Sequence, residues 1–110
     1  MSKMRIEKTF GETVKRLREE RHLPLREVAE AFSIDTSMLG KIEKNSRRPT
    51  RELIGKIAQY FKVSDRELLI AFLSDTVVYQ VMDEEDLSHE VLKVAEKKLQ
   101  YLKTQKSSLI

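Results

Sequence analysis

The spacing of apolar residues along residues 1–73 predicts five helices. Phe10, Val14 and Leu17 lie at i, i+4 and i+7, which is the spacing of one buried helix face, so the first helix extends to about residue 21. The apolar faces of the next four helices are Val28, Ala29 and Phe32; Leu39 and Ile42; Leu53, Ile54, Ile57, Ala58 and Phe61; and Leu68, Leu69, Phe72 and Leu73. We expect these faces to form a core and not a ligand site.

Short polar residues mark where these helices begin. Thr9 to Glu12 and Ser64 to Glu67 both have the S/T-x-x-E form of a capping box, which satisfies free N–H groups of the first helical turn. Asp35 and Thr50 are the N-caps expected for the third and fourth helices. The second helix follows Pro24, whose preset φ suits a helix start.

The last third of the chain predicts one more long helix. Residues 75–82 contain β-branched side chains that are typical of a strand, but they follow the fifth helix without Gly or Pro, so we expect more helix. The acidic residues 83–86 suit a helix N-terminus. Apolar residues then recur near every 3.6 positions, at Leu87, Val91, Val94, Ala95, Leu99 and Leu102.

This C-terminal stripe needs something to pack on, because a single helix of this length is not stable alone in water. It either folds back on the five-helix core or pairs with a second chain, and we expect a symmetric homodimer. The expected dimerisation residues are Val78, Leu87, Val91, Val94, Ala95, Leu99 and Leu102. The chain would then consist of a flexible arm at residues 1–8, a folded domain at 9–74 and a helical extension for dimerisation at 75–110.

Charge is divided unevenly along the 110 residues. Residues 1–72 hold 16 Lys and Arg against 11 Asp and Glu, a balance of +5, whereas residues 73–110 hold 5 against 7, a balance of −2. A polyanion would therefore bind the N-terminal part. Cys is absent from the sequence, which excludes disulfides and thiolate metal sites. Neither a membrane-spanning apolar run nor a secretory start is present, so we expect a cytoplasmic protein.

Catalytic and cofactor chemistry find no support in the sequence. It has no Gly-rich phosphate loop, and His22 and His89 are isolated, without the spacing of metal ligands. The acidic residues 83–86 are typical of a solvated helix start. We therefore expect no enzyme activity, no catalytic residue, no metal site and no cofactor.

The strongest functional pattern lies between residues 25 and 51. A tight turn at Phe32 to Ile34 joins the second and third helices. The outward face of the third helix carries Thr36, Ser37, Gly40, Lys41 and Lys44, which are short or cationic, as a helix in the DNA major groove requires. From Lys41 to Arg51 there are five cationic residues and one acid, Glu43. Such an excess is expected where a protein contacts a phosphate strand.

This region resembles the helix-turn-helix of the Cro/lambda-repressor-like (XRE) family of DNA-binding regulators. The resemblance rests on Val28-Ala29, Ser33, Ile34, Leu39, Ile42-Glu43 and the following NSRRPT. It extends from about Phe10 to about Leu69. It implies an all-α protein, with a lambda-repressor-like five-helix DNA-binding domain at residues 9–74 and an additional C-terminal helix. It also implies a recognition helix at about residues 36–44 that enters the major groove of double-stranded DNA.

The resemblance also assigns roles to single residues. Thr36, Ser37 and Lys41 align with positions that face bases. The phosphate contacts that we expect beside them, from the cationic excess and not from the resemblance, are Arg26, Lys44, Asn45, Arg47, Arg48 and Arg51. Arg18 and Glu43 align with a buried ion pair that fixes the orientation of two helices, and Asn45 stands where the family usually has Gly at a left-handed helix end.

Three positions depart from the family pattern. Pro24 replaces the usual capping Thr or Ser, Leu25 replaces a Gln that commonly contacts DNA, and Ser33 replaces a turn glycine. Leu25 cannot donate a hydrogen bond, so the neighbouring Arg26 is expected to take over a phosphate contact.

Different classes of function remain open at this point. The leading hypothesis is a sequence-specific transcriptional regulator that binds a two-half-site operator as a homodimer; small controller proteins of restriction–modification systems share this size and plan. The alternative is a protein-binding module, such as an antitoxin whose C-terminal extension binds a partner protein. A third reading is a helix-turn-helix that has lost DNA binding, which Leu25 and Gly40 keep open.

Overall fold

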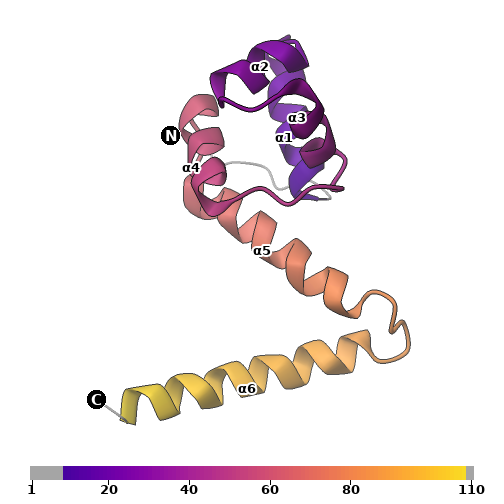
Figure 1. Ribbon diagram of the computed structural model, residues 1–110. Helices are drawn as coiled ribbons and strands as arrows, with labels where there is room; N and C mark the ends of the chain where they lie inside the picture. Colours follow the sequence, from indigo (N-terminus) through magenta and orange to yellow (C-terminus); the bar gives the residue numbers. More distant parts are fainter. Residues whose placement is uncertain (1–8, 109–110) are drawn as a thin grey trace. The chain divides into compact units, whose positions relative to one another are not determined.

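The computed structural model describes residues 9–108, and this part of the chain is all-helical (Figure 1). Its helices are α1 (Phe10–Glu20), α2 (Leu25–Ala31), α3 (Thr36–Glu43), α4 (Arg51–Phe61), α5 (Asp65–Val81) and α6 (Ser88–Ser108). The arm expected at residues 1–8 lies outside the described residues. Contacts divide the chain into a first unit, residues 1–75, and a second unit, residues 76–110.

The helices of the first unit begin where the polar capping residues predict. The Thr9 hydroxyl accepts a hydrogen bond from the Glu12 N–H at 3.2 Å, and the Thr50 hydroxyl accepts one from the Leu53 N–H at 3.1 Å. The Asp35 carboxylate accepts from the Met38 N–H at 2.7 Å. Each bond satisfies one of the N–H groups that the first turn of a helix leaves without a backbone partner.

The apolar faces of α1 to α5 meet in one core. Its buried members are Phe10, Val14, Leu17, Val28, Ala29, Phe32, Leu39, Ile42, Leu53, Ile54, Ile57, Ala58, Phe61, Leu68 and Ala71. The predicted core residues Leu69 and Phe72 are only partly buried against it, and Leu73 is 48% exposed, so the expectation of a buried Leu73 is wrong. Helix α3 packs against both α1 and α2, and Phe32, at the start of the turn between α2 and α3, is buried in this core.

Within residues 9–108, four non-glycine residues have a left-handed backbone where one element passes into the next. They are His22, Ser33, Asn45 and Lys62, with φ between 54° and 63°. Asn45 follows α3, as the sequence predicts, and Ser33 lies in the turn between α2 and α3. A side chain with a Cβ pays a steric cost in this conformation that glycine avoids.

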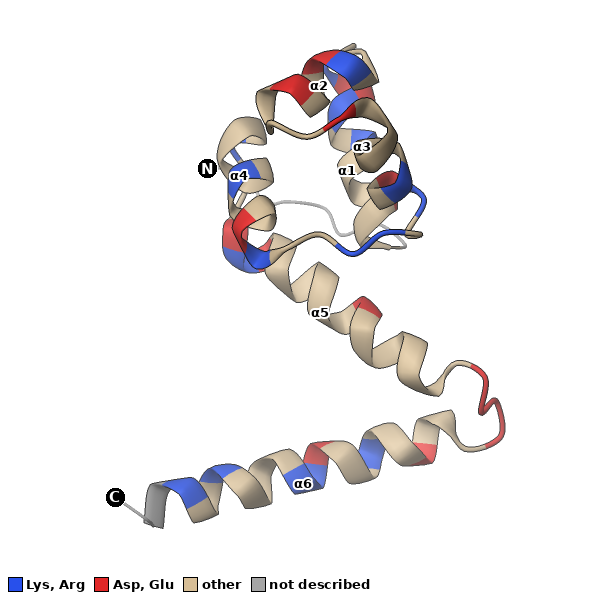
Figure 2. Cartoon of the chain, viewed as in Figure 1, with Lys and Arg blue, Asp and Glu red and all other residues tan. Residues whose placement is uncertain are grey.

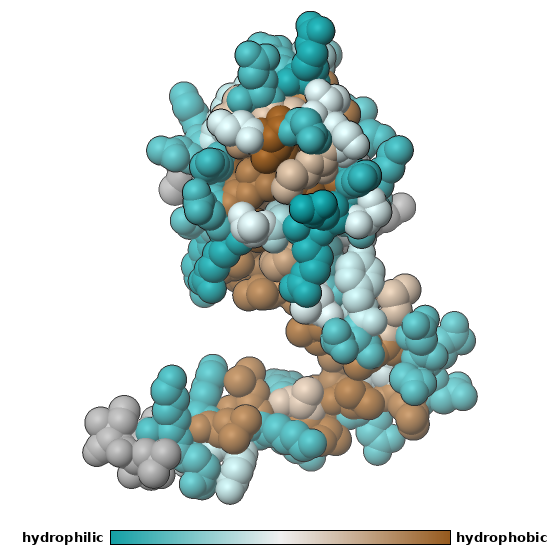
Figure 3. All heavy atoms as spheres, viewed as in Figure 1, coloured by the Kyte–Doolittle hydropathy of each residue, from teal (hydrophilic) through white to brown (hydrophobic). Residues whose placement is uncertain are grey.

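Residues 75–81 continue α5 as helix, as predicted, and the acidic residues 83–86 lie in the turn that separates α5 from α6. Among the described side chains of the second unit, residues 76–106, none is buried. The stripe of Leu87, Val91, Val94, Leu99 and Leu102 is exposed along α6, and Val77, Val78 and Met82 are exposed before it. Brown apolar atoms accordingly mark the visible surface of these segments (Figure 3).

Candidate nucleic-acid interface

Helix α3 has one face fixed in the protein and one face open to solvent. Leu39 and Ile42 are buried in the core, and Glu43 is 6% exposed at the end of the helix. Thr36, Ser37, Lys41 and Lys44, on the other side, are all exposed. The residues predicted to face bases therefore stand on a helix whose orientation is set by packing on its opposite face.

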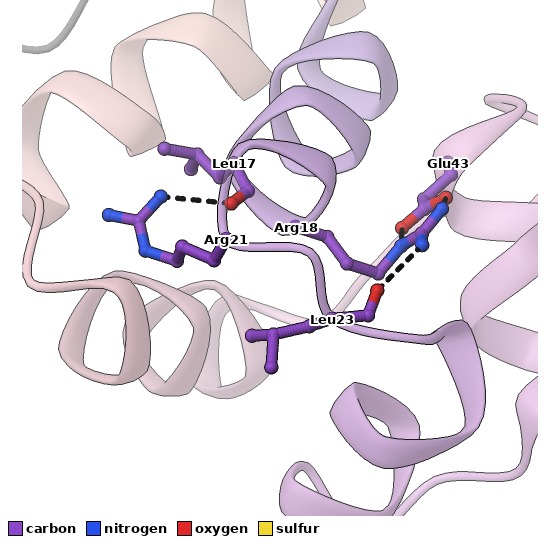
Figure 4. Close-up of polar contacts among 5 residues, drawn as sticks. All are labelled: Leu17, Arg18, Arg21, Leu23 and Glu43. Carbon is purple, nitrogen blue, oxygen red and sulfur yellow. Dashed lines mark hydrogen bonds and ion pairs between the residues drawn. The ribbon is translucent and has the colours of Figure 1, made fainter.

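An ion pair between Arg18 of α1 and Glu43 of α3 holds this orientation (Figure 4). Arg18 Nε donates to Glu43 Oε2 at 2.8 Å, and Arg18 Nη2 donates to Glu43 Oε1 at 3.0 Å. The guanidinium also donates to the Leu23 carbonyl at 3.0 Å, which ties in the segment before α2. The hydrogen bond to Glu43 raises the pKa of Arg18 above its ordinary value and outweighs burial, which lowers it.

A second connection joins the start of α1 to the end of α3 through Asn45. The Asn45 Oδ1 accepts from the Gly11 N–H at 3.0 Å, and its Nδ2 donates to the Thr9 hydroxyl at 2.9 Å. A Cβ at Gly11 would lie 2.5 Å from the carbonyl oxygens of Ile42 and Glu43 and from Asn45 Oδ1. Only glycine at this position allows the two helices to approach so closely. The side-chain amide of Asn45 is thus engaged inside the protein, although the residue itself is exposed.

The candidate phosphate-binding residues lie on α2, at the end of α3, on the loop that follows it and at the start of α4. Arg26, Lys44, Arg47, Arg48 and Arg51 are all exposed. In Figure 2 the loop between α3 and α4 is marked in blue, because Arg47 and Arg48 lie there. The Arg48 guanidinium lies over the Phe72 ring of α5, 5.4 Å from its centroid. This cation–π contact restrains an arginine that the sequence alone places on a free loop.

A family model described as a helix-turn-helix matches residues 14–68. The chain belongs to this helix-turn-helix family. It is the XRE or Cro-like group of DNA-binding regulators, so the resemblance in the sequence identifies the family and its fold correctly. Comparison with curated proteins and with solved structures gives no match.

Within the helix-turn-helix, the unusual Leu25 packs toward α3. Leu25 is partly buried against the core, and its Cδ2 would lie 3.6 Å from a Cβ placed on Gly40. That distance is an ordinary van der Waals contact, so packing inside the protein does not require glycine at position 40. Arg26, the next residue, is exposed and free to face a phosphate.

Asp75 and Arg21 make polar contacts within the helix-turn-helix domain that the sequence pattern does not predict. Asp75 of α5 accepts a hydrogen bond from the Phe10 N–H at 2.7 Å and so caps α1. Asp75, which was expected to open the extension, therefore belongs with the first unit. Arg21 donates to the Leu17 carbonyl at 2.8 Å (Figure 4). It also donates to the Phe61 carbonyl at 3.0 Å, and its guanidinium lies over the Phe61 ring. The Asp75–Phe10 and Arg21–Phe61 contacts join residues 65 and 40 positions apart, whereas the Arg21–Leu17 contact spans one helical turn.

The described residues also bear on metal binding and on membrane crossing. Within residues 9–108, no group of three or more His, Asp or Glu side chains is placed to hold a metal ion. None of the helices in this range combines the length and the apolarity that crossing a lipid bilayer requires.

Proposed function

We propose that this helix-turn-helix protein is a sequence-specific transcriptional regulator that binds a two-half-site operator as a homodimer. The observation that carries the proposal is the division of α3 into two faces. Its inner face is fixed by Leu39, Ile42 and the Arg18–Glu43 pair, and its outer face presents exposed polar side chains next to a cationic loop. A helix held in this way can enter a major groove without losing its own packing.

The roles on the outer face divide by chemistry. Thr36, Ser37 and Lys41 would contact base edges, where Lys can donate to the O6 and N7 atoms of guanine. Arg26, Lys44, Arg47, Arg48 and Arg51 would contact phosphates and supply most of the affinity. Because the amide of Asn45 is already bonded to Thr9 and Gly11, we assign Asn45 a supporting role that holds the loop in place.

The dimer is proposed on geometric grounds. One recognition helix contacts only a few base pairs, whereas two related by a twofold axis reach half-sites about 34 Å apart. The exposed apolar residues of α5 and α6 offer a surface for such pairing. Selection of bound sequences from a random DNA pool should therefore return an inverted repeat.

Salt dependence tests whether the cationic residues bind phosphates. Each neutralised phosphate contributes about −0.9 to the slope of log affinity against log salt concentration. Five cationic residues per protomer would make the slope of a dimer as steep as about −9 if all of them engage. A flat salt response, or selection without any preferred sequence, would contradict the proposal.

The second candidate is a module whose extension binds a different protein. The observation in its favour is that Val77, Val78, Met82 and the α6 stripe are exposed in one chain. Hydrogen exchange on the purified protein separates the two cases. If the exchange rate of α6 amides falls as the protein concentration rises, the homodimer is favoured. If these amides exchange rapidly at every concentration and slow only when a partner protein is added, the second candidate is favoured.

A further inference from the structure

Charge along the second unit changes sign near the middle of its apolar stripe. Residues 83–90 carry five acids, Asp83, Glu84, Glu85, Asp86 and Glu90, and no Lys or Arg. Residues 91–106 carry five lysines, Lys93, Lys97, Lys98, Lys103 and Lys106, and one acid, Glu96. In Figure 2 the turn before α6 is accordingly red and the far part of α6 is largely blue among the charged positions.

The helix dipole explains only part of this distribution. Acids before a helix and cations in its last turn are stabilising, but the effect falls off within one turn. Lys93, Lys97 and Lys98 lie well before the end of α6 at Ser108, whereas Glu90 lies in the first turn of the helix, where the dipole favours it. The position of these lysines in the middle of α6 requires another explanation for the uneven distribution of charge.

We propose that α6 pairs with α6 of a second copy of this chain in antiparallel orientation, with Val94 near the twofold axis. The inference rests on the homodimer of the proposed function and adds its orientation. An antiparallel pair places the acidic half of each helix beside the basic half of the other. A parallel, in-register pair would instead place acids beside acids and lysines beside lysines, which is unfavourable on both halves.

The surface of α6 is self-complementary about Val94. Glu90 and Lys98 border the same surface depression as Leu87, Val91, Val94 and Ala95. Glu90 lies four residues before Val94 and Lys98 lies four residues after it. Antiparallel pairing about Val94 therefore brings Glu90 of one protomer to the level of Lys98 of its partner, and the twofold axis repeats the contact.

The same register uses the apolar stripe and the acidic turn. It brings Leu87 of one protomer to the level of Tyr101 of its partner, and both residues are exposed in the single chain. It also points the end of each α6 that the acidic residues 83–86 precede toward the partner's segment that holds Lys103. Each copy thus offers apolar and charged groups that the other copy complements.

Spin-label distances in the full-length protein test the orientation. The chain has no Cys, so one introduced Cys carries one label per protomer. His89→Cys, Glu96→Cys and Lys103→Cys, seven residues apart, place labels on the exposed side of α6 away from the stripe. In the antiparallel pair the two labels are offset along the helix axis by about 15 Å, 6 Å and 27 Å, respectively, whereas in a parallel pair they have no offset.

The expected result is therefore the shortest label separation at position 96 and the longest at position 103. Equal separations at the three positions would overturn the antiparallel orientation while leaving a dimer. A monomer, with no coupling between labels at any position, would overturn the pairing itself. Operator binding measured on the same samples reports on the proposed function separately, because a protein that selects DNA but fails the distance test contradicts the orientation alone.

Charge exchange supplies a second measurement. Glu90→Lys and Lys98→Glu should each weaken the dimer at least several-fold in sedimentation equilibrium, and the double variant should restore it, because the exchanged charges still face each other across the twofold axis. Glu96→Lys is the matched control, since Glu96 lies on the opposite side of α6 from the depression, and it should leave the dimer unchanged. A double variant as weak as the single variants would contradict the proposal.

Discussion

Arg18 and Glu43 join α1 to the end of α3 through two parallel N–H to carboxylate hydrogen bonds, of 2.8 Å and 3.0 Å. The two side chains are 13% and 5% exposed, so removal of one partner strands the other in a place with little water. We expect Glu43→Ala or Arg18→Ala to lower the free energy of unfolding by about 3–5 kcal/mol, measured by urea denaturation.

Comparison with a surface pair provides the control. Arg16 and Glu20 on α1 form an ion pair of 2.9 Å, but Glu20 is 51% exposed. Glu20→Ala should therefore change the unfolding free energy by less than about 1 kcal/mol. Because the pKa of Arg18 is raised, the stability that its charge contributes is complete at every pH below the ordinary arginine pKa. The difference in unfolding free energy between Arg18→Ala and Glu20→Ala should therefore stay constant through the neutral pH range.

Gly11 is the position where helix propensity and packing make opposite predictions. Alanine is intrinsically better than glycine in a helix, but a Cβ at Gly11 would lie 2.5 Å from two backbone carbonyl oxygens of α3. Those atoms cannot turn aside as a flexible side chain can. We expect Gly11→Ala to destabilise the protein by about 1–3 kcal/mol or more in thermal and urea unfolding.

Gly55 of α4 is the matched case in open space, since a Cβ there would meet no atom within 4 Å. Gly55→Ala should stabilise the protein by about 0.5–1 kcal/mol through helix propensity. If both substitutions changed stability in the same direction, the close approach at Gly11 would not be the reason for its glycine.

How far the sequence predicts this structure depends on whether a feature repeats locally. The helices, their caps and most of the core follow from spacing, and the continuation of α5 past residue 75 follows from the absence of Gly and Pro. Leu73 was misassigned because the stripe of α5 continues past the end of the core. The exposed face of α3 could be predicted because its residues are those that the buried positions Leu39 and Ile42 leave on the other side of the helix.

Contacts between distant segments could not be predicted in this way. The Asp75 cap on α1 and the Arg48 contact with Phe72 join residues that no periodicity relates. The Asn45 bonds to Thr9 and Gly11 are of the same kind, because an asparagine in a basic loop gives no sign of which polar groups the fold will bring to it. The Arg18–Glu43 pairing was predicted from the family resemblance alone. The periodicity of α6 predicts a helix with an apolar face but does not indicate what that face packs against.

Left-handed backbone at residues with a Cβ offers a direct test of strain. Ser33 and Lys62 have φ of 59° and 57°, where glycine is favoured. We expect Ser33→Gly and Lys62→Gly each to raise the free energy of unfolding by about 0.5–1 kcal/mol, since relief of the steric cost exceeds the added entropy of the unfolded chain. Gln59→Gly, inside α4, should instead lower it by about 1 kcal/mol, and urea denaturation of the three variants gives the comparison.

The division of labour on the DNA-facing side predicts that two cations of equal charge behave differently. Lys41 lies on the exposed face of α3, whereas Arg48 lies on the following loop with its guanidinium over Phe72. Lys41→Ala should change which bases are preferred at one position of the selected site, with a loss of about 1–3 kcal/mol for the preferred sequence. Arg48→Ala should weaken all sequences about equally and make the salt slope shallower by about 0.9 for each protomer.

Lys62→Gly serves here as the control, because it removes one positive charge just after the end of α4 that lies farthest from Arg51, and it should leave DNA affinity unchanged. The measurement is a titration of selected and single-substituted DNA sites at several salt concentrations with each variant. If Lys41→Ala and Arg48→Ala lost affinity in parallel for every sequence, then α3 would contact only the phosphate backbone. The positioning of α3 by Glu43 and Asn45 would in that case serve docking on DNA and not the choice of sequence.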